Sequence, residues 1–354
     1  MNRVLEGRKL NKKLLFIVVL ISVLFIILVS ILIYRYNENK WNNVDISNAV
    51  RAVIVDDVTS FYRKPKKTKF RHISDLEFGE YIYIIEEYTS DDGQEWYKVK
   101  CKDRVGFIDR SSAKFYDHID DDSKVLMSDV SKFNVIYKDF ENSGDYAAFL
   151  LKYGVNYAYI RLGGRGYGDE GKFYTDPNYE MFIEACEYLE MPYGFYYIDE
   201  AITDEELDEE VIFVQDFLNK NKTDMNLLPL AIDAEYHDGV GRADEMWDER
   251  ADLISNLILK FKEKGIDSIV YSNANTASEY LYEIDSKFWI AYYDKKNKIP
   301  DYWYTETDQE SALNEEFTDK IIAWQFTETG IEKNSKYQVD FSIVDNRFFK
   351  QFVR

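Results

Sequence analysis

The chain has 354 residues, a formal net charge of −21 at pH 7, and a hydrophobic content of 46%. The acidic excess argues against nucleic acid as a partner, because that binding needs basic patches, and equally against docking on anionic polymers by simple charge attraction. The two cysteines, Cys101 and Cys186, fall in different segments, so we expect no disulfide framework.

The first predicted element is a transmembrane helix over residues 14–34, an apolar stretch without a charge that is long enough to span a bilayer. It is too long for the core of a cleavable signal and lacks small-residue cleavage sites. Basic residues are denser before it (Arg3, Arg8, Lys9, Lys12 and Lys13) than close behind it (Arg35 and Lys40). The positive-inside rule therefore predicts a cytoplasmic tail over residues 1–13, a single membrane pass, and export of everything that follows. The alternative is a buried core helix.

After a predicted linker over residues 35–48, residues 49–116 have the pattern of short strands with turn signals. Gly79 follows an apolar segment, residues 96–100 form an alternating strand that begins with Trp96, and residues 105–109 close the unit with a Gly-Phe-Ile sequence. This pattern resembles bacterial SH3 domains, and the resemblance implies a small all-β SH3-like barrel that binds wall peptide. The alternative is a folded spacer. The acidic run over residues 117–123 is a predicted linker.

From residue 124 to residue 354, apolar strands alternate with helices. Strands are predicted at residues 125–128, 157–162, 193–198, 228–232, 268–271, 288–292, 321–324 and 337–340. Thr203 and Glu206 form a capping box at the start of one helix, and Gly154 and Gly265 end two others. Alternation of nearly continuous apolar strands with helices indicates a parallel sheet covered on both faces. Eight strands fit an α/β barrel of the (β/α)8 type, with reduced helices in the last units.

Polar side chains fall where the predicted strands end, which in such barrels is the rim that carries the active site. The candidates are Asp129, Arg161, Tyr196, Tyr197, Asp233, Glu235, Ser272, Asn273, Tyr292, Gln325 and Asp340, to which Tyr236 and Tyr271 add aromatic rings. Carboxylates at three strand ends, an arginine and several tyrosines are typical of a saccharide site, where rings stack on sugar faces. Trp324 is expected to fill the barrel interior, and Gln325 is expected to be a ligand.

Asp233 and Glu235 follow an apolar run at spacing i, i+2. Side chains at this spacing on a strand project to the same side, roughly 6.6 Å apart. Two carboxylates so placed suit the acid and its partner at a glycosidic bond, although this separation lies between the retaining and inverting ranges. The alternative is a helix N-cap aspartate followed by an incidental glutamate.

From Met127 to the end, the sequence resembles glycoside hydrolase family 25, the bacterial and phage muramidases. The matching segments begin at Ser128, Ala158, Asp176, Tyr193, Ile232, Val270, Trp289, Ala323 and Gln338, in the order and spacing of the family. The first motif departs from the family at Ser128, and at Asn134 where glutamine is frequent. The resemblance implies that Glu235 is the general acid, that Asp233 is its carboxylate partner, and that Asp129 and Asp340 complete the floor of the site.

The implied activity is cleavage of the β-1,4 bond between N-acetylmuramic acid and N-acetylglucosamine in peptidoglycan glycan strands. Retaining, inverting and substrate-assisted routes stay open, the last with Asp233 orienting the N-acetyl group. The three histidines (His72, His118 and His237) and two cysteines have no ligand spacing, so we expect neither metal nor cofactor. The alternative function is a non-catalytic wall-binding protein that uses both predicted domains as docking surfaces.

Overall fold

The computed structural model describes residues 12–353, apart from residues 118–123, 169, 222–226, 238, 294–298, 301–302, 304–314 and 332–336. The predicted linker over residues 117–123 and the predicted tail over residues 1–13 therefore lie almost entirely outside the described residues. The chain divides into two compact units. One comprises residues 1–50, 60–75 and 82–110, and the other comprises residues 51–59, 76–81 and 111–354.

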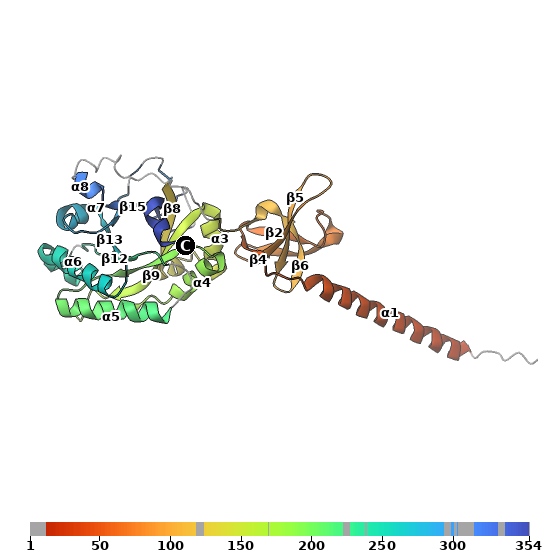
Figure 1. Ribbon diagram of the computed structural model, residues 1–354. Helices are drawn as coiled ribbons and strands as arrows, with labels where there is room; N and C mark the ends of the chain where they lie inside the picture. The colour runs from red at the N-terminus through yellow and green to blue at the C-terminus, as the bar shows by residue number, and fades with distance from the viewer. Residues whose placement is uncertain are drawn as a thin grey trace, which may run out of the picture. The chain divides into compact units, whose positions relative to one another are not determined.

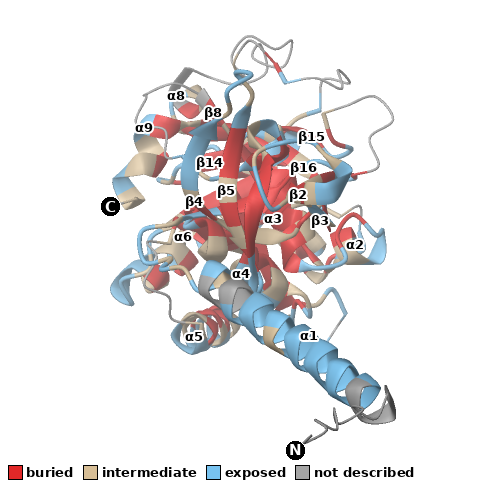
Figure 2. Cartoon of the chain, turned by 90° about the vertical axis from the view of Figure 1, so that its right-hand side faces the viewer, coloured by how far each residue is buried: buried red, intermediate tan, exposed pale blue. Residues whose placement is uncertain are grey.

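The first described element is a long helix, α1 (Lys12–Asn42). Its segment Phe16–Tyr36 is long and apolar enough to cross a membrane, and none of that segment is buried within the protein. Figure 2 shows α1 exposed along most of its length. The hydroxyls of Ser22 and Ser30 donate to the carbonyl oxygens four residues earlier, so these two polar groups are satisfied within the helix. The exposure of α1 argues against the alternative of a buried core helix.

Seven strands follow as one sheet. They are β1 (Val50–Ile54), β2 (Val58–Tyr62), β3 (His72–Glu77), β4 (Tyr81–Thr89), β5 (Glu95–Cys101), β6 (Arg104–Asp109) and β7 (Ala113–Lys114), in the order β3-β2-β6-β5-β4-β1-β7. Two short 3-10 helices, η1 (Lys69–Arg71) and η2 (Arg110–Ser112), interrupt them. Phe61, Ile82 and Trp96 are buried here. Gly79 turns the chain before β4 with φ 84°, which favours glycine. The region is all-β, as expected, and its SH3-like assignment stays a prediction.

Eight strands of the second sheet close into a barrel (Figure 1). They are β8 (Lys124–Val130), β9 (Val155–Arg165), β11 (Tyr193–Ile198), β12 (Leu230–Asp233), β13 (Ser268–Asn273), β14 (Phe288–Ala291), β15 (Ile321–Thr327) and β16 (Asp340–Asp345). The short strand β10 (Phe173–Thr175) pairs antiparallel with β9 outside this ring. β8 pairs with both β9 and β16, which closes the barrel.

The barrel is not wholly parallel, which corrects one expectation. Pairing is parallel from β8 through β15, but β16 runs antiparallel to both β15 and β8. The eighth strand was predicted at residues 337–340, with Asp340 at its end, whereas Asp340 begins β16. Residues 328–339 form the whole connection between β15 and β16, a length near the minimum for the crossover that a parallel neighbour requires, and β16 instead returns in the opposite direction.

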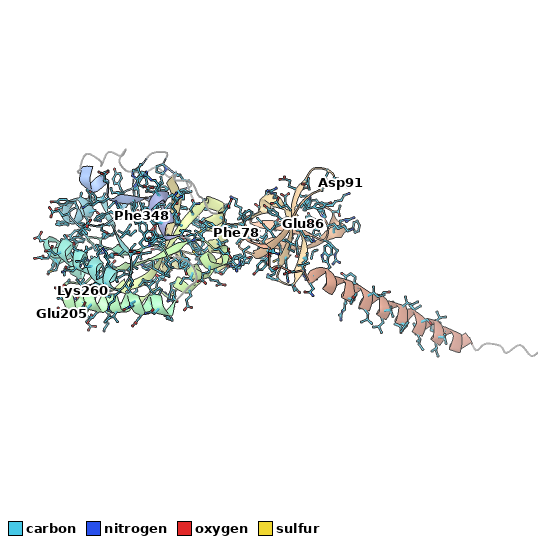
Figure 3. All side chains as sticks on the ribbon, in the orientation of Figure 1. Phe78, Glu86, Asp91, Glu205, Lys260 and Phe348 are labelled. Carbon is cyan, nitrogen blue, oxygen red and sulfur yellow. The ribbon has the colours of Figure 1, made fainter. Side chains whose placement is uncertain are left out.

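Helices cover the outside of the barrel, and Figure 1 shows α4, α5 and α6 around the strands. They are α2 (Lys132–Ile136), α3 (Ser143–Tyr153), α4 (Tyr179–Leu189), α5 (Asp204–Lys220), η3 (Arg242–Met246), α6 (Trp247–Glu263), α7 (Ala274–Thr276), η4 (Ala277–Leu281), α8 (Glu315–Thr318), α9 (Asn346–Phe349) and η7 (Lys350–Phe352). Figure 3 labels Glu205 on α5 and Lys260 on α6. The Thr203 cap is confirmed, since its side chain accepts from the Glu206 N–H, but the Glu206 carboxylate accepts from the Ile202 N–H instead of the cap residue.

Two hydrophobic clusters fill the barrel unit. The larger lies between the strands and the helices, and the smaller lies inside the ring and contains Tyr159, Tyr271 and Trp289. Trp324 belongs to the larger cluster, which corrects the expectation that it fills the interior. Because side chains alternate along a strand, Trp324 and Gln325 point to opposite faces, and Gln325 is the one that faces inward.

Candidate functional site

Four carboxylates converge at one mouth of the barrel. Asp129 and Asp233 lie at the carboxyl ends of parallel strands, and Glu235 follows two residues after Asp233. Asp340 reaches the same rim because its strand is antiparallel, so its first residue pairs with Asp129. All four line a cavity of about 520 Å³. Its other lining residues are Ser131, Phe133, Asn134, Tyr137, Arg161, Tyr196, Tyr271, Trp289, Tyr293, Glu328, Thr329 and Gln338.

The backbone around Asp233 and Glu235 is held in an extended form beyond the end of β12. The Ala234 N–H donates to the Tyr271 carbonyl at 3.0 Å, and the Ser272 hydroxyl donates to the Ala234 carbonyl at 2.6 Å. Both contacts tie Ala234 to β13, so the residues on either side of it are presented to the cavity. No helix begins at Asp233, so the alternative of an N-cap aspartate does not apply.

Glu235 carries a carboxyl with a raised pKa. Burial raises the pKa of its carboxyl to about 7, and the negative charges of Asp129 and Glu328 act in the same direction. A hydrogen bond from Asn273 acts in the opposite direction. The side-chain oxygen of Asn273 accepts from the Thr276 N–H at 2.9 Å, which leaves its amide group to donate to Glu235. The carboxyl of Glu235 therefore keeps its proton over a large part of the neutral range.

The pKa of Asp233 is also raised well above its usual range. Burial is the main cause, followed by the charge of Glu235, and the guanidinium of Arg161 opposes them. Arg161 is itself fixed, because its Nε and Nη2 donate to the same oxygen of Asp176 at 2.9 and 2.7 Å. Arg161 thus reaches the cavity as a rigidly placed positive charge among the carboxylates.

Asp129 and Asp340 form a carboxyl pair on the side of the cavity away from β12. Their side chains are hydrogen-bonded, and burial raises the pKa of Asp129 to about 6. Burial and the charge of Asp129 also raise the pKa of Asp340 well above its usual range. Gln325 fixes the pair, since its Nε2 donates to Asp129 Oδ2 at 3.0 Å. Its Oε1 in turn accepts from the hydroxyls of Tyr271 and Tyr293, at 2.9 and 2.8 Å.

An aromatic pair lies at the rim, with Phe133 on α2 and Tyr137 as the C-cap residue of that helix. The rings of Phe133 and Tyr137 stack with centroids 6.1 Å apart and planes 21° apart, and the two residues are 43% and 58% exposed. α2 is held by Asn134, whose amide donates to Asp139 and to the Gln338 carbonyl at 3.1 and 3.0 Å. The pair is therefore a preformed apolar surface continuous with the cavity.

Several predicted site residues do not line the cavity. Tyr197 is fully buried on the helix side, where its hydroxyl contacts Glu210 at 3.3 Å. Tyr292 packs against the larger hydrophobic cluster, while its neighbour Tyr293 enters the cavity. Tyr236 is 45% exposed and lies beside Trp247. Gln325 and Asn273 are not among the residues that line the cavity; each donates a hydrogen bond to a carboxylate, Gln325 to Asp129 and Asn273 to Glu235. Adjacent residues in an extended chain point to opposite faces, so Tyr197 and Tyr292 face away from the cavity.

The predictions missed other lining residues. Tyr293 and Glu328 follow strand ends. Phe133 and Asn134 lie on α2, directly after the Asp129 strand, and Tyr137 caps the end of that helix. The position of Phe133 and Tyr137, four residues apart on a helix next to a carboxylate-bearing strand, could have indicated them. Trp289 lies inside the ring, with its indole N–H donating to the Ser342 hydroxyl at 2.9 Å. In the part of the chain that the structure describes, no group of three or more histidine, cysteine or acidic side chains has the geometry to hold a metal ion.

Comparisons with solved structures give weak likenesses. The Clostridium perfringens spore cortex lytic enzyme SleM is 22% identical, with a TM-score of 0.48 over 63% of this chain and 68% of its own. The catalytic domain of endolysin ply40 from bacteriophage P40 of Listeria monocytogenes is 17% identical, with a TM-score of 0.48 over 66% of this chain and 98% of its own. The modular autolysin LytC from Streptococcus pneumoniae, in complex with a synthetic peptidoglycan ligand, is 16% identical, with a TM-score of 0.45 over 77% of this chain.

This chain spans 54% of the length of that LytC chain. A comparison with curated protein sequences found no match. The sequence itself matches the model of the glycosyl hydrolases family 25 over residues 128–334, which is more than half of the chain and runs from the end of β8 through β15. With the eight-stranded barrel and a carboxylate-lined cavity at its mouth, this match shows that the chain belongs to glycosyl hydrolases family 25 and is a glycoside hydrolase.

Proposed function

We propose that this glycoside hydrolase cleaves the β-1,4 bond between N-acetylmuramic acid and N-acetylglucosamine in peptidoglycan, with Glu235 as the general acid. The observation that carries the proposal is a carboxyl with a pKa raised to about 7, set among three other carboxylates in an open cavity. A glycosidase needs an acid that is protonated at its working pH to release the leaving-group oxygen. Glu235 is therefore assigned to donate its proton to the bridging oxygen.

Asp233 is assigned to the anomeric side of the same bond. Its raised pKa makes it a poor nucleophile in the free enzyme. This supports an orienting role, in which the Asp233 carboxylate accepts a hydrogen bond from the N–H of the substrate's N-acetyl group while the acetyl oxygen attacks the anomeric carbon. As Glu235 loses its proton, positive charge develops on the sugar ring. The carboxylates of Asp233 and Asp129 are assigned to stabilise that charge electrostatically.

The remaining cavity residues are assigned to sugar binding. Tyr196 and Arg161 line the cavity and offer hydrogen-bond donors, and the hydroxyl oxygen of Tyr271, whose proton goes to Gln325, offers an acceptor. Phe133 and Tyr137 offer flat apolar faces at the rim. The axial C–H groups of a sugar ring pack on such aromatic faces in saccharide sites. A cavity of about 520 Å³ that is open at its rim is consistent with part of a polymer chain as its occupant.

The rest of the chain is assigned to placing the enzyme at the wall. Helix α1 is proposed to be a single-pass anchor with the N-terminus in the cytoplasm, and the β1–β7 region is proposed to be an SH3-like domain that contacts wall peptide or acts as a spacer. A signal sequence would have the same length and composition as the apolar part of α1. Mass spectrometry of the membrane-extracted protein distinguishes the two, since an anchor keeps residues 1–36 and a signal sequence does not.

The central test is to incubate the full-length protein in detergent with purified peptidoglycan. New reducing ends should appear, and mass spectrometry of the fragments should find N-acetylmuramic acid at the reducing end. N-acetylglucosamine at that end would contradict the assigned bond specificity. Binding to the wall without any new reducing ends would favour the non-catalytic docking function instead.

A further inference from the structure

A strongly basic segment interrupts this acidic chain between β2 and β3. Residues 63–71, here called the basic loop, contain six lysines and arginines and no acidic residue. Of these, Lys64, Lys66, Lys67 and Lys69 are exposed, and Lys67 forms an ion pair with Asp109 at 3.0 Å. Phe70 is fully exposed within the loop. The acidic excess of the whole chain therefore does not describe this surface.

The basic loop lies against the end of the apolar part of α1, within the same compact unit. The Arg63 guanidinium donates to the Tyr34 hydroxyl at 3.3 Å and lies 5.8 Å from the centre of that ring. The indole N–H of Trp41, one turn beyond the apolar segment, donates to the Val105 carbonyl of β6 at 3.0 Å. These contacts place the loop at the level of Tyr34 and Tyr36, where an apolar span of this kind would end.

A second cavity, of about 530 Å³, opens between this loop and the helix end. Its lining includes Tyr34, Trp41, Arg63, Phe70, Arg71 and Arg104. Arginines bind phosphate groups through paired N–H donors, and tyrosine and tryptophan favour the boundary between headgroups and acyl chains. The cavity thus combines donors for an anion with apolar rings beside it.

We propose that the basic loop and this cavity bind the headgroups of anionic phospholipids, with Phe70 entering the acyl boundary. The inference rests on the proposed role of α1 as a membrane anchor. Its chemistry is that of a surface element in which basic side chains contact lipid phosphates and a neighbouring apolar ring inserts. The positive-inside rule does not oppose it, because that rule counts residues within about 20 positions of a span and the loop begins farther along the chain.

The function of this contact would be to hold the β1–β7 unit on the membrane surface instead of leaving it tethered by α1 alone. Each basic side chain within a Debye length of an anionic surface changes the ratio of bound to free loop by about fivefold. Replacing two lysines should therefore lower this ratio by about 25-fold in anionic membranes, and should have little effect in neutral ones.

The test places a nitroxide at position 70, through Phe70→Cys, in the full-length protein reconstituted into vesicles. Cys101 and Cys186 are buried, so labelling is selective. The vesicles are pure phosphatidylcholine or phosphatidylcholine with phosphatidylglycerol. The expected result is a label that oxygen reaches and an aqueous nickel complex does not, in the anionic vesicles only. A label at Asp91→Cys, in the turn between β4 and β5 (Figure 3), should stay in water in both.

Lys66→Gln with Lys69→Gln should return the position 70 label to water, while the matched pair Lys262→Gln with Lys264→Gln, on exposed lysines near the end of α6, should not. High salt should weaken the contact in the same way. Equal water exposure of position 70 in both vesicle types would overturn the proposal. Immobilisation of the label only when poly(glycerol phosphate) is added would overturn it in favour of a wall polymer. Failure of the protein to float with either vesicle would overturn the anchor itself.

Discussion

Replacement of Glu235 by glutamine tests both the chemistry and the electrostatics of the cavity. The glutamine side chain would keep the size of the original and lack its acidic proton. Because general acid catalysis contributes about 10²- to 10⁴-fold, kcat/KM on peptidoglycan should fall by that factor, or about 3–5 kcal/mol of transition-state stabilisation. Reducing-end release by wild-type and variant protein measures this loss directly.

The pH dependence of the wild-type enzyme gives the second part of this prediction. With a pKa of about 7, the Glu235 carboxyl is protonated in about nine tenths of molecules at pH 6 and in about one tenth at pH 8. Activity should therefore fall on the alkaline side with a midpoint near pH 7. Glu328→Gln is the matched control, because Glu328 lines the same cavity and its charge raises the pKa of Glu235. Glu328→Gln should keep the maximal rate and move this midpoint to lower pH.

The Glu235→Gln variant should also be more stable than the wild type at alkaline pH. Between the usual glutamate pKa near 4.5 and the raised value of about 7, the native state binds more proton than the unfolded state. The free energy of unfolding therefore falls as pH rises through that window. Above the window, the destabilisation caused by the ionised Glu235 carboxylate is fully present. Removing the ionisable group should raise the stability at pH 8 by roughly 1–3 kcal/mol, with little effect at pH 4. Thermal melting at both pH values measures the difference.

Two results would refute this reasoning. One is a folded Glu235→Gln protein that keeps a tenth or more of the wild-type kcat/KM. The other is a variant that is less stable than the wild type at pH 8, which would mean that the Glu235 carboxylate is well solvated or well paired in the native state.

Three further predictions concern the residues around the carboxylates. Gln325→Leu should lower both the melting temperature and kcat, because it leaves buried polar partners unpaired at about 1–3 kcal/mol each, and calorimetry with initial rates checks both. Tyr137→Ala should raise KM on long glycan strands severalfold without changing the melting curve, whereas Ile136→Ala, 59% exposed on the same helix but outside the cavity, should leave KM unchanged. Arg250→Met should destabilise the fold by about 3–5 kcal/mol, because Asp199, which pairs with Arg250 at 2.7 Å, would become an uncompensated buried charge. Urea titration measures the loss, and an unchanged urea midpoint would contradict this prediction.

The sequence determined a large part of the barrel. Strand β11 was predicted at the bounds that the structure has, and the helix start after Thr203 and the αL residues Gly154 and Gly265 were read from local capping rules. These features depend on neighbours within a few residues, so sequence reasoning can find them. The convergence of Asp129, Asp233, Glu235 and Asp340 was also predicted from the sequence, because these carboxylates lie near the ends of predicted strands.

Only the tertiary structure decided which face and direction each strand takes. Asp340 was placed at the end of a parallel strand, and it reaches the site because β16 is antiparallel and begins there. Tyr292 and Tyr293 are adjacent, yet only Tyr293 enters the cavity. Register and direction are set by pairing with strands far away in the chain, and a shift of one residue exchanges the two faces. The pKa of Glu235 has the same origin, because burial, the charges of Asp129 and Glu328, and a hydrogen bond from Asn273 set it, and these residues lie far from Glu235 in the chain.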